Sequence, residues 1–170
     1  MRFLLPFAML LFSSLWLPAQ PMDNVRMDSI FRMVLDSVTG QPGRWELTIG
    51  DFKMLCLTDE SHDRMRIITP VQRLEDATPE EIYKCLEANF HTALDVKYAI
   101  ADDMIWVAFI HPLGSLQDDQ LIDALKQVRS AALTYGTIYT STDLVFPKPE
   151  GDKQESKPKT KEPPVIRGRL

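Results

Sequence analysis

One stretch of sequence decides the predicted fold: MIWVAFI, at residues 104–110. Successive side chains of a β-strand point to opposite faces, so a strand with one face in water alternates apolar and polar residues. This stretch is apolar at every position. Its two faces carry Met104, Trp106 and Ile110, and Ile105, Val107 and Phe109, respectively. We therefore expect a strand that is covered on both faces, by helices of the same chain or by helices and a partner subunit.

Four further strands are predicted around this one, at residues 45–49, 52–58, 64–69 and 96–100. Residues 45–49 alternate apolar and polar side chains, the period of a half-buried strand. The first three are separated by Gly50-Asp51 and by the polar loop 59–63, and the fourth is joined to residues 104–110 by residues 101–103. Loops this short connect antiparallel neighbours.

Three amphipathic helices complete the prediction. The first is expected from Asp23 to Gly40, the second begins at Thr78-Pro79-Glu80-Glu81, which has the residues of a capping box, and the third covers residues 118–133. The apolar stripe of the second helix contains Ile82, Cys85, Leu86, Asn89, Phe90 and Ala93. The order α-β-β-β-α-β-β-α indicates an α+β fold, in which a five-stranded antiparallel sheet packs with three helices, and not a doubly wound fold.

Residues 1–20 are predicted to be a signal peptide. Arg2 supplies the positive start, residues 3–17 are almost wholly apolar, and Ala19 is a small residue at the expected cleavage point. The apolar run is shorter than the roughly 20 residues that span a bilayer, which favours cleavage and export over a retained membrane anchor. Export would place the protein in a periplasm or outside the cell, with no membrane span left after cleavage.

The remaining chain divides into an acidic body and a basic tail. Residues 21–146 carry eleven Lys and Arg against twenty Asp and Glu, a net charge of −9. An acidic body argues against nucleic acid as a partner, because phosphates need a basic face. Residues 147–170 carry a net charge of +3 with five Pro and five Lys, and are expected to be disordered. Such a tail would be either a solubilising end or a cationic tether.

Four stretches of the body resemble a known family. They are RMRIITP at residues 64–70, LEANF at 86–90, WVAFIHPL at 106–113 and the helix at 121–132. Together they resemble the YbjN-like family of bacterial sensory transduction regulators, which shares its fold with the class I type III secretion chaperones. The resemblance implies the five-stranded sheet, dimerisation and the binding of protein partners without catalysis. It carries over no catalytic residue.

Two polar residues are candidate structural or ligand-binding positions. Asn89 interrupts the apolar stripe of the second helix, and a buried amide must be hydrogen-bonded. It would either bind loop backbone or contact a ligand. His111 precedes Pro112 at the end of a strand. It would either fix the turn through a backbone hydrogen bond or bind a metal together with His91 and Asp95.

The two cysteines leave one question open. Cys56 lies in a predicted strand and Cys85 on the apolar face of the second helix. In an oxidising compartment they could form a disulfide, which would close a loop of about 30 residues and stabilise the fold by roughly 3–4 kcal/mol. The alternative is two separate buried thiols, which protein cores tolerate well.

These observations predict an exported, non-enzymatic, chaperone-like module that binds an unidentified protein or peptide. No motif for a cofactor or a resident metal is present in the sequence. Because one face of residues 104–110 needs a cover, we expect a homodimer, with Met104, Trp106 and Ile110 as its dimer or partner surface. The alternative is a small envelope enzyme or metal-binding protein centred on His111.

Overall fold

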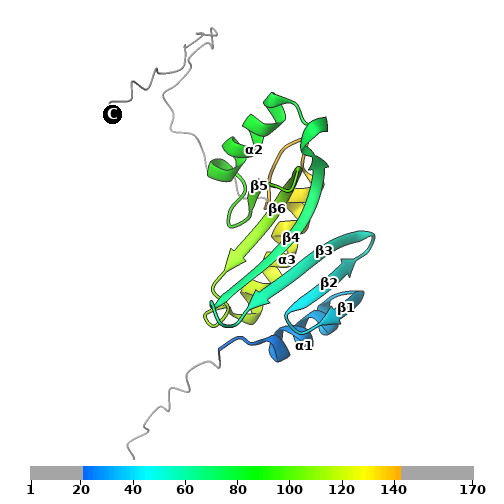
Figure 1. The fold of residues 1–170 in the computed structure, drawn as a ribbon, viewed down its shortest axis with the longest axis vertical. Coiled ribbons are helices and arrows are strands. Elements are labelled where there is room, and N and C mark those ends of the chain that lie inside the picture. The colour runs from blue at the N-terminus through cyan, green and yellow to red at the C-terminus, as the bar shows by residue number, and fades with distance from the viewer. Residues whose placement is uncertain (1–20, 143–170) are drawn as a thin grey trace, which may run out of the picture.

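The computed structural model describes residues 21–142, so the predicted signal peptide and the tail at 147–170 lie outside the described residues. The described residues form one antiparallel sheet with three α-helices (Figure 1). The helices are α1 (Asn24–Val34), α2 (Pro79–His91) and α3 (Asp118–Leu133), and a 3-10 turn, η1, covers Leu74–Asp76. The strands are β1 (Ser37–Gln41), β2 (Arg44–Ile49), β3 (Phe52–Asp59), β4 (Arg64–Arg73), β5 (Lys97–Ala101) and β6 (Met104–His111). None of the described helices is long and apolar enough to cross a membrane.

The α+β class, the three helices and the antiparallel sheet are as predicted, but the number of strands is not. The sheet has six strands, in the order β1-β2-β3-β4-β6-β5, and the prediction of five was wrong. The additional strand, β1, occupies residues that were predicted to continue the first helix. Helix α1 ends instead at Val34, and Leu35 is already extended.

The misassigned segment fits two periodicities. Val38 follows Leu35 at helical spacing, but in β1 it lies opposite the buried Leu47 of β2. The turn at Pro42-Gly43 decides the outcome, because it places Gln41 opposite Arg44 and starts an antiparallel ladder. Gly40 has a positive φ of 97°, as a helix cap would, yet it lies within β1 opposite Trp45.

The other helix boundaries follow the sequence signals. Thr78 caps α2: its hydroxyl accepts a hydrogen bond from the amide of Glu81, whose carboxylate accepts one from the amide of Thr78. Helix α3 has its predicted bounds, and at its start the amide of Gln117 donates to the side chain of Gln120 at 2.9 Å. These caps satisfy donors that the first turn of a helix otherwise leaves free.

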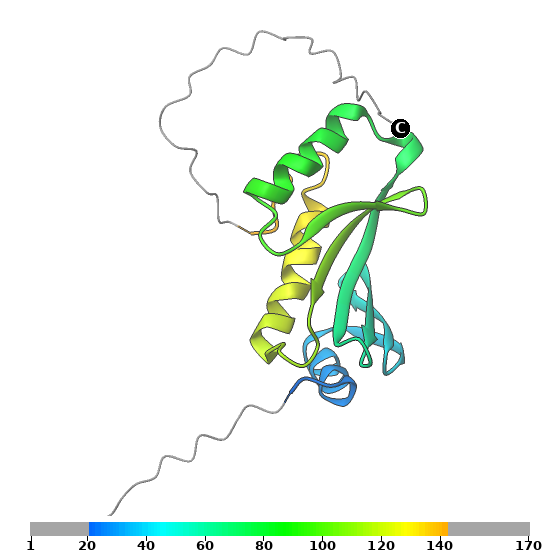
Figure 2. The ribbon, with the colours of Figure 1, turned by 60° about the vertical axis from the view of Figure 1, so that its left-hand side comes forward.

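All three helices pack on the same side of the sheet. On β6, Ile105, Val107 and Phe109 are buried, and the residues between them are half-buried or exposed. Figure 2 shows α3 beside the sheet with no helix on the opposite side. The expectation that both faces of this strand are covered is therefore not met within residues 21–142. We call the uncovered side the open face.

Helix α1 is fixed to the covered face through Trp45 of β2. This side chain is fully buried and meets the ring of Phe31 edge-on at 5.5 Å. Its indole N–H donates to the carboxylate of Asp28 at 2.9 Å. The guanidinium of Arg32 also donates to this carboxylate, and the two donors lower the pKa of Asp28.

The geometry of β1 gives a test at Gly40. A Cβ at this position would overlap the carbonyl oxygen of Arg44, and the backbone already has a positive φ. We expect Gly40→Ala to lower the free energy of unfolding by about 2 kcal/mol in urea melts.

The matched control is Gly50→Ala. Gly50 also has a positive φ, of 58°, but a Cβ added there would have no atom within 4 Å. We expect a loss of only about 1 kcal/mol at this position. Equal losses at the two positions would contradict the pairing of β1 with β2.

Candidate functional site

The predicted surface residues Met104, Trp106 and Ile110 do share the open face. Met104 and Trp106 are half-buried, and Ile110 is 56% exposed. The indole N–H of Trp106 donates to the carbonyl of Ala101 at 3.0 Å, which anchors the side chain to the end of β5. The open face therefore presents apolar side chains that no helix of the described chain covers.

A second apolar surface lies between α1 and α3, and we call it the α1–α3 groove. Its volume is ≈ 550 Å³. One wall is α3, with Ile122, Leu125 and Leu133, and the other contains the end of α1 and the end of β2. The groove residues are Val34, Leu35, Ile49, Ile122, Leu125, Lys126, Arg129, Ser130, Leu133 and Thr134. A groove of this size and composition suits apolar side chains of a ligand.

Two cations border this groove. Lys126 and Arg129 are exposed residues of α3, and neither forms an ion pair within residues 21–142. An apolar floor with a cationic border suits a segment that combines apolar and acidic side chains. Since the groove residues are far apart in sequence, no local pattern indicated the groove.

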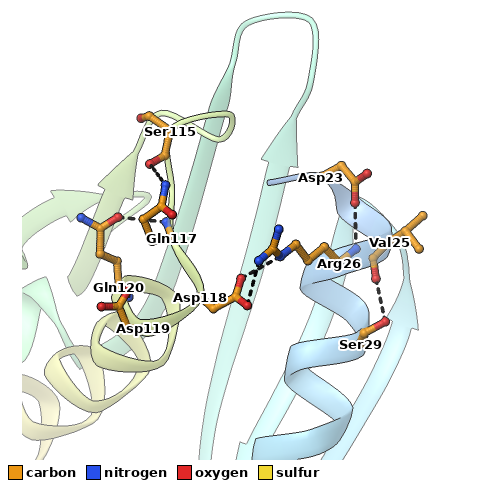
Figure 3. A network of polar contacts seen from close by, with 9 residues as sticks. All are labelled: Asp23, Val25, Arg26, Ser29, Ser115, Gln117, Asp118, Asp119 and Gln120. Carbon is orange, nitrogen blue, oxygen red and sulfur yellow. Dashed lines mark hydrogen bonds and ion pairs between the residues drawn. The ribbon is translucent and has the colours of Figure 1, made fainter. Parts of the chain in front are cut away.

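A bidentate ion pair connects the helices that form the groove. The guanidinium of Arg26, in the first turn of α1, donates to both carboxylate oxygens of Asp118 at 2.8 and 3.0 Å (Figure 3). Asp118 is the first residue of α3, where a negative charge also suits the helix dipole. Both side chains are partly exposed, so the pair orients the two helices more than it stabilises the fold.

The outer side of α2 carries a third apolar surface, the α2 surface. Tyr83, Leu86 and Phe90 follow one stripe of the helix and are 57, 64 and 83% exposed. Leu94, in the loop before β5, and Ile100, in β5, are also exposed. The sequence predicted Leu86 and Phe90 on the packed stripe, and this was wrong. Cys85 and Ala88 face the core instead, because α2 has apolar residues around most of its circumference and can pack by either side.

Asn89 connects α2 to β5. Its amide donates to the carbonyl of Tyr98 at 3.1 Å, and its carbonyl accepts from the amide of Tyr98 at 2.7 Å. Of the two roles considered for Asn89, the structure shows hydrogen bonding to backbone. This pairing satisfies a polar group beside the core and sets the position of α2 on the sheet.

His111 lines a small cavity of ≈ 240 Å³ with Asp95, Asp123 and Gln127. Nδ1 of its imidazole ring lies 2.8 Å from the carbonyl oxygen of Pro112, and the ring stacks on that of Phe109. The buried amide of Gln127 donates to the carboxylates of Asp95 and Asp123. Within residues 21–142 no group of three His, Cys, Asp or Glu side chains is placed to hold a metal ion. His91 does not line this cavity.

The two cysteines are separate free thiols in the structure. Cys56 lies in β3 opposite Trp45 and Ile67, and Cys85 lies on the inner side of α2. Burial raises the pKa of both thiols, that of Cys85 to about 11. Both therefore remain protonated near neutral pH and are poor nucleophiles.

The comparison with solved structures finds similar proteins, and it shows the fold alone. No protein-family model matches the sequence, and no curated protein matches it. One similar structure is the HopA1–SchA chaperone–effector complex, with a TM-score of 0.52 and 11% identity over 64% of this chain and 88% of that chain. Another is the Yersinia pestis type III secretion chaperone SycH in complex with a fragment of YscM2, with a TM-score of 0.49 and 15% identity over 65% of this chain and 99% of that chain. The chain therefore has a type III secretion chaperone-like fold, with one strand more than predicted.

Proposed function

We propose that the chain is a non-enzymatic, chaperone-like module that binds a segment of another protein in the α1–α3 groove. The observation that carries this proposal is the groove itself: ≈ 550 Å³ of largely apolar surface, open to solvent beside an ion pair that holds its helices. The fold is that of chaperones, one of which forms a complex with an effector protein. This likeness supports a protein as the ligand.

The character of the groove favours a polypeptide. Leu133 is 57% exposed at its border, so an apolar side chain of a ligand would cover surface that is now in water. The hydroxyl and backbone groups of Ser130 and Thr134 lie among these apolar residues, and Thr134 already bonds to neighbouring backbone. The site therefore offers shape, apolar area and two cations, which select a binding partner without performing chemistry on it.

We further propose that the chain forms a homodimer through the α2 surface. A closed two-fold contact places each surface against its own copy. Such a contact is favourable on α2, because the exposed side chains of the α2 surface are mainly apolar. The charge of Lys84 is already paired with Glu87 at 3.2 Å. On the open face such a contact would bring together the cations of the two copies, because Arg44, Lys53 and Arg66 point to this face and form no ion pair within residues 21–142. The open face is therefore better suited to a different partner.

Export and family membership complete the proposal. The order of charged, apolar and small residues at 1–20 supports export to a periplasm or to the medium. The stretches at 64–70, 86–90 and 106–113 support a relationship to the YbjN-like family. Together these features would make the chain an exported protein that binds other polypeptides.

Photo-crosslinking from the border of the groove tests the binding function. With p-benzoylphenylalanine in place of Leu133 in the full chain, irradiation of producing cells should give adducts that mass spectrometry identifies as polypeptides. The same amino acid in place of Val25, which is 71% exposed and outside the groove, is the matched control. Adducts of equal yield at both positions, or none at Leu133, would contradict binding in the groove.

Light scattering of the full chain tests the dimer. Phe90→Glu should convert the dimer to a monomer at micromolar concentration, because it places a charge on the most exposed apolar residue of the α2 surface. Trp106→Glu, on the open face, should leave the mass unchanged. A dimer that survives Phe90→Glu but dissociates with Trp106→Glu would place the contact on the open face.

A further inference from the structure

The open face combines an apolar centre with an uneven distribution of charge. The strand register identifies its members, because residues paired across antiparallel strands point to the same side. Its apolar residues are Leu55, Leu57, Ile68, Pro70, Ala99, Ala101, Met104, Trp106, Ala108 and Ile110.

These apolar side chains are contiguous across four strands. Leu55 lies opposite Ile68, and Ile68 lies opposite Ala108 on β6. The neighbouring row continues from Pro70 to Trp106 and then to Ala99 on β5. The result is an apolar band that crosses the sheet, which single exposed residues on an ordinary surface do not form.

A shallow hollow of ≈ 470 Å³ lies over β1 to β4 beside this band. Leu55, Ile68, Pro70 and Trp106 line it on one side. Ser37, Thr39, Arg44, Glu46, Thr48 and Lys53 also line it, together with Leu47 and Met54. A bound segment could thus place apolar side chains in the hollow while polar groups contact its border.

The open face carries the carboxylate of Glu46, but its cations outnumber its anions, whereas the body is acidic. Arg44, Lys53 and Arg66 point to this face, and none of them forms an ion pair within residues 21–142. By contrast, Arg26 and Arg32 on α1 are each paired with a carboxylate. In a body with a net charge of −9, three cations without partners on one face provide a complementary surface for an anion.

We propose that the open face binds an acidic segment of a partner protein, with apolar side chains on the band and carboxylates on Arg44, Lys53 and Arg66. A polypeptide is favoured over nucleic acid or an anionic membrane because the acidic body repels extended phosphate surfaces. The inference rests on the proposed function, polypeptide binding, and adds a second surface and the charge of its ligand. Ionic strength should weaken the contact, because these cations are near solvent.

Fluorescence titration of the full chain tests the inference with a labelled peptide that alternates leucine and glutamate. Peptides with glutamine or lysine in place of glutamate are controls for charge. We expect the acidic peptide to bind best, and Arg66→Glu to weaken it by about tenfold, the effect of about 1.4 kcal/mol. Lys84→Glu, which reverses an exposed cation of α2 outside both the groove and the open face, should leave the affinity unchanged. A change in tryptophan emission should disappear in Trp106→Phe.

The outcomes separate this inference from the proposed function. If the three peptides bound equally, the proposal of polypeptide binding would stand, but the inference that the open face selects acidic side chains would be overturned. Sensitivity to Lys126→Glu but not to Arg66→Glu would move the acidic ligand to the groove and overturn the inference. If none of the three peptides bound, the inference about the open face would also be overturned. Crosslinking at Leu133 would still show whether the α1–α3 groove binds a polypeptide. Since Arg66 is exposed, its variant should fold, and Lys53→Glu provides an independent second test.

Discussion

The packing of β6 determines which surfaces the molecule offers. This strand is apolar on both faces, but α1, α2 and α3 contribute their buried residues to one side of the sheet. Ile105, Val107 and Phe109 are therefore buried, while Trp106 and Ile110 stay at the surface. A strand with two apolar faces can satisfy only one of them in a two-layer fold. The uncovered side is available to a ligand.

The connections between the helices and the sheet shape the other surfaces. Arg26 and Asp118 hold the beginnings of α1 and α3 together, and the apolar groove lies where α3 faces the end of α1. Asn89 holds α2 to β5 through both backbone groups of Tyr98, which leaves Tyr83, Leu86 and Phe90 on the outer side of the helix. The groove lies between α1 and α3, whereas the α2 surface and the open face meet near Ala99 and Ile100 of β5.

The sequence predicted the fold class and the central strand, and its errors have physical causes. Val38 satisfies both a helical and an extended pattern, and only pairing with β2 makes residues 37–41 a strand. Apolar residues surround α2, so its pattern could not indicate whether Leu86 faces the core or solvent. The groove could not be predicted, because Leu35, Ile49 and Leu133 meet only in the folded chain. Alternation along β6 could show that Met104, Trp106 and Ile110 share one face, but it could not show which face the helices cover, because both faces are apolar.

Quenching of Trp106 fluorescence by acrylamide reports whether the open face remains accessible when the chain is dimeric. The signal of Trp106 is the difference between the full chain and Trp106→Phe, and Trp45 is fully buried. We expect Trp106 to stay accessible to acrylamide at every protein concentration, including those at which light scattering reports a dimer. Loss of quenching as the dimer forms would show instead that a second copy covers the open face.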